Sequence, residues 1–258
     1  MLSRETVELR GGQKQVVFRG GDGPPLVWLH AADGIDNGQP LVAELTKRHT
    51  VTAPLAPGFD DPADLGAVDD VHELAMHYDD LLETLGLDEV TVVGHSFGAM
   101  IGAEIAAHYP RRVARLVLIA PVGLWNDDYP VLDLFAVPFP DLPSVLYADP
   151  SFAPAPLPGD GEPDVEALVT LARGMTAVAK FIWPIPDRGL ARRLGRIQAR
   201  TLVVFGAEDR LVPPRYADDF VAGIPDASKA IVAGAGHMVP VERPEEVLAL
   251  LDDFQRGD

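Results

Sequence analysis

The chain has 258 residues, of which 47% are hydrophobic and 23% charged, enough apolar material for one large globular domain or for a core domain with an insertion. Its 39 acidic and 21 basic residues give a formal net charge of -18, which repels nucleic-acid phosphates and anionic lipid headgroups, so nucleic acid is not an expected partner. The absence of cysteine excludes disulfides, thiolate zinc sites and a cysteine nucleophile, and we expect no metal site.

The hydrophobic stretches are short. The longest, around Leu116 to Trp125, is well below the ~18 residues that a membrane helix needs, so we expect no membrane insertion. The amino terminus, Met1 to Arg10, carries charges where a secretory signal would have an apolar centre. We therefore expect a cytoplasmic protein.

The first predicted element is a hairpin. The segments Thr6 to Arg10 and Gln15 to Phe18 alternate around Gly11-Gly12, a pair that accepts the positive φ of a tight turn. Continuous apolar runs follow, each ended by Gly, Pro or a polar turn, at residues 26–29, 90–93, 116–120 and 202–205. Strands that are apolar on both faces are buried on both, which indicates a parallel sheet covered by helices.

The segments between these runs fit helices. Val71 to Leu85 has apolar residues at helical spacing, and Gly86 is placed to end it. Alternating strands and helices predict an α/β fold with a mostly parallel sheet, helices on both faces and right-handed crossovers.

This alternation stops between Val122 and Leu194. The segment is rich in proline yet also holds several large aromatic side chains, which a flexible linker does not need. We predict a cap over residues 122–194, inserted into a core made of residues 1–121 and 195–258, partly helical at Val165 to Phe181 and with Pro154 to Pro163 as a mobile surface loop. The alternative is a long ordered loop that only covers the core.

The sharpest motif is Gly94-His95-Ser96-Phe97-Gly98. It follows the apolar strand at 90–93 and opens a helix-compatible stretch at 99–107, which is the strand-turn-helix context of a nucleophile elbow. Glycines two residues before and after Ser96 let strand and helix approach closely, while the turn lifts the hydroxyl out of the sheet. The alternative is a glycine-rich turn in which Ser96 only caps the helix.

A serine nucleophile needs a base, and the base needs an acid that orients it. Asp209 follows the strand at 202–205 in Gly206-Ala207-Glu208-Asp209, and His237 follows the apolar run at 230–233 in Gly234-Ala235-Gly236-His237. The order Ser96, Asp209, His237 is the one expected for such a triad. Other interpretations remain. His237 could be a surface histidine, and Glu208, Asp127 or Asp128 could be the acid.

Acyl transfer also needs donors for the oxyanion that forms. The backbone N–H of Phe97 is one candidate, and the N–H of Ala32, in the loop after the strand at 26–29, is the second. The alternative for that loop is a simple connection without a donor role.

With these motifs in place, the chain resembles the α/β-hydrolase fold family along nearly its whole length. The matching pieces are Trp28-Leu29-His30, Ala56-Pro57-Gly58-Phe59, the elbow at 94–98, Gly206-Ala207-Glu208-Asp209 and Gly236-His237. The resemblance implies a sheet of about eight strands that needs no cofactor, with a cap inserted after the sixth strand. It also implies that cap and loops form the substrate pocket, for which the candidates are His30, Met100, Phe135, Phe139, Trp183 and Met238.

Two departures from the family pattern narrow the function. Members usually have His-Gly where this chain has His30-Ala31, which adds a Cβ to the oxyanion loop. In the related hydrolases that cleave carbon-carbon bonds of ring-fission products, the elbow serine tends to follow Asn and the histidine tends to precede Trp, whereas this chain has His95 and Met238. Trp183, Arg188, Arg192 and Arg193 are left as groups that an anionic substrate would meet.

The sequence therefore predicts a serine hydrolase of a small-molecule carboxylic ester, lactone or thioester. Ser96 would attack the acyl carbon, His237 would move the proton, and Asp209 would hold the imidazole. The alternatives are a carbon-carbon bond hydrolase of diketones and a ligand-binding protein without catalysis.

Overall fold

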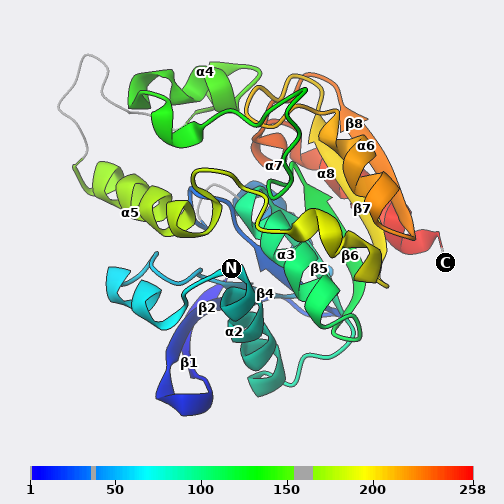
Figure 1. Cartoon of the computed structure of the whole chain (residues 1–258). Helices are drawn as coiled ribbons and strands as arrows, with labels where there is room; N and C mark the ends of the chain where they lie inside the picture. The colour runs from blue at the N-terminus through cyan, green and yellow to red at the C-terminus, as the bar shows by residue number, and fades with distance from the viewer. Residues whose placement is uncertain (1, 36–38, 154–164, 258) are drawn as a thin grey trace.

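A computed structural model describes residues 2–35, 39–153 and 165–257, and in this part of the chain eight strands form one sheet in the order β1-β2-β4-β3-β5-β6-β7-β8 (Figure 1). β1 and β2 are antiparallel to each other, β2 is antiparallel to β4, and the other neighbours are parallel. The strands are β1 Ser3–Glu8, β2 Lys14–Gly20, β3 Pro25–Leu29, β4 Thr50–Pro54, β5 Val90–His95, β6 Val113–Ile119, β7 Arg200–Gly206 and β8 Ala227–Val232.

Helices connect and cover the strands. The α-helices are α1 Gln39–Leu45, α2 Val71–Thr84, α3 Phe97–His108, α4 Leu142–Leu146, α5 Val165–Ile182, α6 Tyr216–Gly223, α7 Val239–Glu242 and α8 Pro244–Arg256. Short 3-10 helices lie at η1 Arg10–Gly12, η3 Pro62–Ala67, η4 Leu134–Ala136, η5 Phe139–Asp141, η6 Pro150–Phe152, η7 Leu190–Arg192 and η8 Leu194–Arg196.

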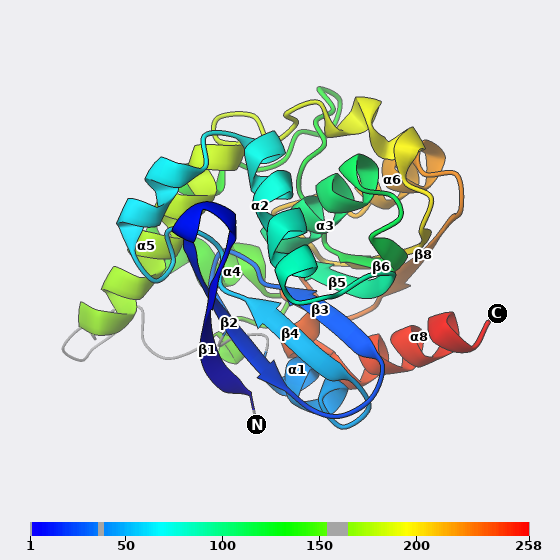
Figure 2. The ribbon, with the colours of Figure 1, turned by 90° about the horizontal axis from the view of Figure 1, so that it is seen from below.

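The sheet has a core on each face. Alternate residues of β3 enter opposite cores: Val27 and Leu29 pack with residues of α2, α3 and α6, while Leu26 and Trp28 pack with residues of α1 and α8. Figure 2 shows these two groups of helices on opposite sides of the sheet. The apolar runs of the sequence therefore do mark strands buried on both faces, and the predicted α/β fold is confirmed.

Most predicted elements are confirmed with small shifts at their ends. The amino-terminal hairpin pairs Ser3 with Arg19 through Glu8 with Lys14, so its first strand starts and ends earlier than predicted. β4 was not located from its own residues, because Thr50, Thr52 and Pro54 interrupt the apolar pattern although Thr52 is buried.

The chain leaves the sheet between β6 and β7. There it forms α4, α5 and most of the 3-10 helices, and Figure 1 shows α4 and α5 outside the sheet and its flanking helices. α5 confirms the helix predicted over residues 165–181. The cap boundaries at 122 and 194 stay a prediction, and the loop predicted at Pro154 to Pro163 lies outside the described residues.

Within the described ranges, none of the helices combines the length and the hydrophobicity that a membrane crossing requires.

Candidate active site

Ser96 occupies a strained turn between β5 and α3. Its φ of 53° and ψ of -112° lie outside the regions that residues with a side chain normally adopt, at a cost of about 1–3 kcal/mol. Although Ser96 immediately precedes α3, its side chain makes no capping hydrogen bond to the helix. The hydroxyl is therefore free for another partner, unlike that of a serine that only caps a helix.

The two glycines of the elbow are required by close backbone contacts. A Cβ at Gly94 would lie 2.5 Å from the carbonyl oxygen of Gly98, and a Cβ at Gly98 would lie 2.1 Å from the carbonyl oxygen of Leu29. Any larger residue would separate α3 from β5 and β3. The packing thus fixes Ser96 at the carboxyl end of the central strand.

Three side chains from distant segments meet at this point. The Ser96 Oγ lies 2.8 Å from His237 Nε2, and His237 Nδ1 lies 2.8 Å from Asp209 Oδ2. The second oxygen of Asp209 accepts the backbone N–H groups of Leu211 and Val212, each at 2.9 Å. All three side chains are buried, so the carboxylate is held by fixed donors and the imidazole by the carboxylate.

His95, next to Ser96, contacts the backbone of His237. Its Nε2 lies 2.9 Å from the carbonyl oxygen of His237 and can donate a hydrogen bond to it. Burial, with a smaller effect of His237, lowers the pKa of His95 to about 3. His95 is therefore neutral at physiological pH and adds no positive charge beside the base.

The other candidate acids have different partners. Glu208 accepts the N–H of Ala235 at 3.0 Å, and Asp127 accepts the indole N–H of Trp125 at 2.8 Å. Asp128 is exposed. Among the acids considered, Asp209 is the one that contacts His237.

The two proposed oxyanion donors border the same cavity as Ser96. Phe97 is the first residue of α3, so its N–H has no partner within the helix. Ala32 also lines the cavity. Its loop is held by α5, where a Cβ at Gly174 would lie only 2.4 Å from the Ala32 carbonyl oxygen.

His30 anchors this loop rather than lining the cavity. Its Nε2 accepts the N–H of Ala56 at 2.9 Å, which leaves Nδ1–H to donate to the carbonyl of Ala31 at 2.7 Å. Burial lowers the pKa of His30 to about 4, so the ring is neutral. The imidazole thus connects the loop after β3 with the loop after β4.

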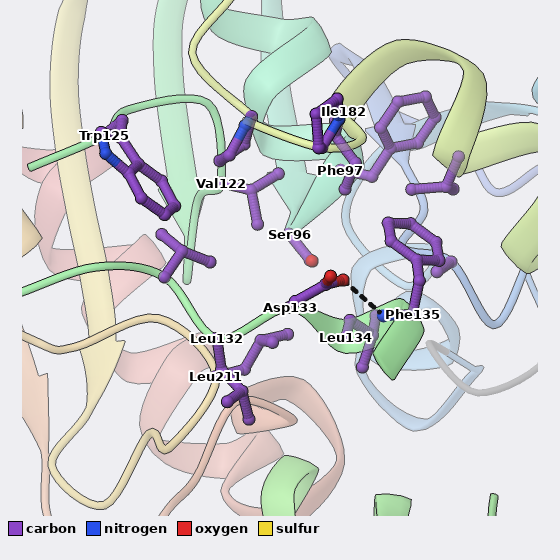
Figure 3. Close-up of a pocket in the computed structure, with 15 residues that line it drawn as sticks. Ser96, Phe97, Val122, Trp125, Leu132, Asp133, Leu134, Phe135, Ile182 and Leu211 are labelled. Carbon is purple, nitrogen blue, oxygen red and sulfur yellow. Dashed lines mark hydrogen bonds between the residues drawn. The ribbon is translucent and has the colours of Figure 1, made fainter. Parts of the chain in front are cut away.

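The cavity beside Ser96 has a volume of about 60 Å³ and mostly apolar walls. Figure 3 shows the Ser96 hydroxyl surrounded by these side chains. Residues between β6 and β7 supply most of them, including Val122, Trp125, Val131, Leu132, Asp133, Leu134, Phe135, Val178, Ile182, Pro184 and Pro186. The segment predicted as a cap therefore forms most of the pocket wall.

Of the six pocket residues predicted from the sequence, Phe135 lines this cavity and the other five do not. His30, Met100 and Met238 are buried in the surrounding structure, whereas Phe139 and Trp183 are 43% and 52% exposed.

The arginines predicted to meet an anionic substrate do not line the cavity either. Arg188 donates hydrogen bonds to the carbonyls of Phe181 and Trp183, and Arg193 pairs with Glu104. Sequence reasoning missed Trp125, Val131 and Ile182 because their positions depend on how the inserted segment folds.

Glu242 connects the loop that carries His237 to the inserted segment between β6 and β7. One carboxylate oxygen accepts the N–H of Gly236 at 2.7 Å, and the other accepts the N–H groups of Ala148 and Asp149 at 2.9 and 3.1 Å. The side chain is buried. Nothing in the sequence indicates this role, since Glu242 lies two residues after a proline in a short helix and resembles a surface acid.

Replacing Glu242 with Ala is expected to destabilise the protein by about 3 kcal/mol, because three backbone donors lose their acceptor. For a chain of this size the melting temperature should fall by about 6–12 °C. Differential scanning calorimetry measures this, with the exposed Glu245, in the first turn of α8, replaced by Ala as a control. Equal melting temperatures for the two variants would contradict the connecting role.

Two of the buried histidines of the site, His30 and His95, predict acid-sensitive stability. Their folded pKa values of about 4 for His30 and about 3 for His95 lie below the ordinary 6.5, so the unfolded chain takes up protons first as the pH falls. Their stabilising contribution is full above pH 6.5 and is lost towards the folded values. From about pH 7.5 to about pH 5.5, each should lower the free energy of unfolding by about 1 kcal/mol. Urea unfolding at the two pH values measures this loss in the wild type and in His95→Asn. The loss should be smaller in His95→Asn, and an equal loss in both proteins would contradict a neutral His95.

Known proteins share this fold. A family model described as the alpha/beta hydrolase family matches residues 16–250, and the chain belongs to this family. It is 27% identical over 256 residues to a 2-hydroxy-6-oxononadienedioate/2-hydroxy-6-oxononatrienedioate hydrolase of Comamonas testosteroni, an alignment that covers 91% of this chain and 88% of the relative.

Solved structures give the same architecture. The naproxen esterase of Bacillus subtilis is 17% identical with a TM-score of 0.76, over 99% of this chain and 92% of the other. A 2-hydroxy-6-oxo-6-phenylhexa-2,4-dienoate hydrolase from Rhodococcus sp. strain RHA1 is 20% identical with a TM-score of 0.73, over 99% and 100%. At these identities the structural likeness shows the fold, while the family match and the hydrolase relatives identify the chain as a hydrolase.

Proposed function

We propose that the protein is a serine hydrolase that cleaves a carboxylic ester, or a related lactone or thioester, through an acyl-enzyme intermediate. The observation that supports this most directly is the continuous hydrogen-bonded row of Asp209, His237 and the Ser96 hydroxyl, with 2.8 Å at both contacts. A hydroxyl, an imidazole and a carboxylate in this order activate serine in several unrelated hydrolase folds.

In the proposed reaction His237 takes the proton of Ser96 as Oγ attacks the acyl carbon, and it then delivers that proton to the leaving alcohol or thiol. Asp209 holds Nδ1–H of the imidazole and stabilises the imidazolium that forms. Water, activated in the same way by His237, attacks the acyl-enzyme and releases the acid. No redox cofactor is needed, because each step only exchanges an acyl group and a proton.

The developing oxyanion needs donors that are already in place. The free N–H of Phe97 at the start of α3 supports its proposed role, and the positive end of the helix dipole favours a negative charge there. Ala32 is the proposed second donor, since it borders the same cavity as Ser96. Losing one such donor typically lowers the rate by ~10² to 10³.

Cleavage of a carbon-carbon bond is the second candidate, because the Comamonas relative is named as a hydrolase of 2-hydroxy-6-oxononadienedioate, a compound without an ester bond. The purified protein is given a short-chain activated ester, chosen to suit a cavity of about 60 Å³, and separately a vinylogous diketone acid. We expect kcat/KM for the ester to be higher by at least about tenfold. A higher value for the diketone would replace the ester proposal with the second candidate.

A protein that only binds its ligand is the third candidate. It would turn over neither compound and would leave Ser96 unreactive towards a fluorophosphonate. The buried and fully hydrogen-bonded Asp209 argues against this, because a binding pocket alone does not need a carboxylate aligned with an imidazole.

A further inference from the structure

The pocket beside Ser96 contains a carboxylate that the triad does not use. Asp133 precedes η4, and its Oδ1 accepts the N–H of Phe135 at 3.0 Å. Figure 3 shows this carboxylate and the Ser96 hydroxyl pointing into the same part of the pocket. Among the described residues, none donates a hydrogen bond to the second oxygen of Asp133, so that oxygen is available to a ligand.

Asp133 is also the one charged side chain among the described residues that line the pocket. The neighbouring walls are apolar, including Leu134, Phe135 and Leu211. Asp133 itself is exposed, so water screens its charge, but a carboxylate at close range still attracts cations and hydrogen-bond donors and repels carboxylates. Such a residue can give the pocket a charge preference that is separate from the triad.

We propose that Asp133 is a specificity-determining residue, an inference that rests on the proposed function. The natural substrate then carries a cationic or hydrogen-bond-donating group near its scissile bond. The repulsion acts equally against substrates with a carboxylate at that position. This includes dienedioates of the kind named for the Comamonas relative, so Asp133 also disfavours such acids.

The structural role of Asp133 is separable from its charge. Asparagine has the same shape, and its amide oxygen can still accept the Phe135 N–H, so Asp133→Asn removes the charge while it retains the turn before η4. Asp61 is a matched control: its carboxylate likewise accepts a backbone N–H, that of Ala63 at 2.9 Å, but it does not line the pocket. Asp61→Asn reports the effect of removing one charge from a protein with a net charge of -18.

The experiment uses three acetate esters that differ mainly in charge: acetylcholine, its neutral isostere 3,3-dimethylbutyl acetate, and 2-acetoxyethanesulfonate. Acid release gives kcat/KM for each ester in the wild type and in both variants. Ratios are taken within one variant, so a change in overall activity cancels. We expect the cation-to-neutral ratio and the neutral-to-anion ratio each to fall about fivefold in Asp133→Asn, the size expected for two unit charges a few ångströms apart in a water-accessible pocket. The ratios in Asp61→Asn should match those of the wild type.

A second measurement separates the charge preference from catalysis. Choline, 3,3-dimethylbutanol and 2-hydroxyethanesulfonate are titrated by calorimetry into Ser96→Ala, with and without Asp133→Asn. The proposal is supported if the cation binds most tightly and the anion least tightly, and if Asp133→Asn makes these affinities more alike. This holds even if no ester is hydrolysed. Absence of ester hydrolysis would overturn only the proposed function. Turnover or binding ratios that do not change with Asp133→Asn would overturn the role of Asp133 and leave the hydrolase proposal intact.

Discussion

Ser96→Ala is expected to lower kcat for a short-chain ester by at least about 10⁴-fold, because the acyl-enzyme route needs the serine oxygen. The remaining rate would come from the oxyanion donors and from substrate binding, which still act on attack by water. The stability should change little, since within the described part of the chain the Ser96 hydroxyl bonds only to His237. Initial rates with purified protein measure the effect.

Ser144→Ala is the matched control for this substitution. Ser144 is exposed, and its hydroxyl bonds the carbonyl of Asp141 away from the cavity. We expect the control to retain activity within about twofold, as is usual for surface substitutions. A Ser96→Ala protein with a wild-type melting temperature and near-wild-type turnover would mean that Ser96 is not the nucleophile.

Asp209→Asn is expected to lower kcat by about 10⁴-fold while the fold is retained. The amide oxygen of asparagine can still accept the N–H groups of Leu211 and Val212. Its NH₂ group would then face His237 Nδ1 and favour the imidazole tautomer with hydrogen on Nε2. That hydrogen would point at Ser96, so the imidazole could no longer accept the serine proton.

The neighbouring acid provides the comparison for Asp209. Glu208→Gln keeps an acceptor for the Ala235 N–H and does not alter the contact with His237, so kcat should stay within about threefold. Parallel kinetics of the two variants test the assignment. Equal losses in both would contradict Asp209 as the specific partner of the imidazole.

The sequence predicted the parts of the site that depend on local backbone chemistry. The elbow at 94–98 was recognisable from its context. Two glycines that flank a strained serine between a buried strand and a helix are typical of a nucleophile elbow. Asp209 and His237 follow apolar runs that became β7 and β8, and the carboxyl ends of parallel strands lie at one edge of a sheet.

The pocket wall was less predictable, because it depends on packing between distant segments. Trp183 is aromatic and lies in the inserted segment, yet it is 52% exposed, whereas Ile182 beside it lines the cavity. The end of α5 decides between them, because Ile182 is its last residue and Trp183 lies just beyond it, while the sequence predicted that the helix ends at Phe181. Asp133 and Glu242 were missed for a related reason, since their roles arise from contacts made only in the folded chain.

The most direct test of the proposed triad is the site of covalent modification by a fluorophosphonate. Peptide mass spectrometry of the treated protein should place one adduct on Ser96, with labelling reduced at least about 10³-fold in His237→Ala, because the hydroxyl then lacks its base. An unmodified Ser96, or labelling at the same rate without His237, would contradict a serine nucleophile activated by that histidine.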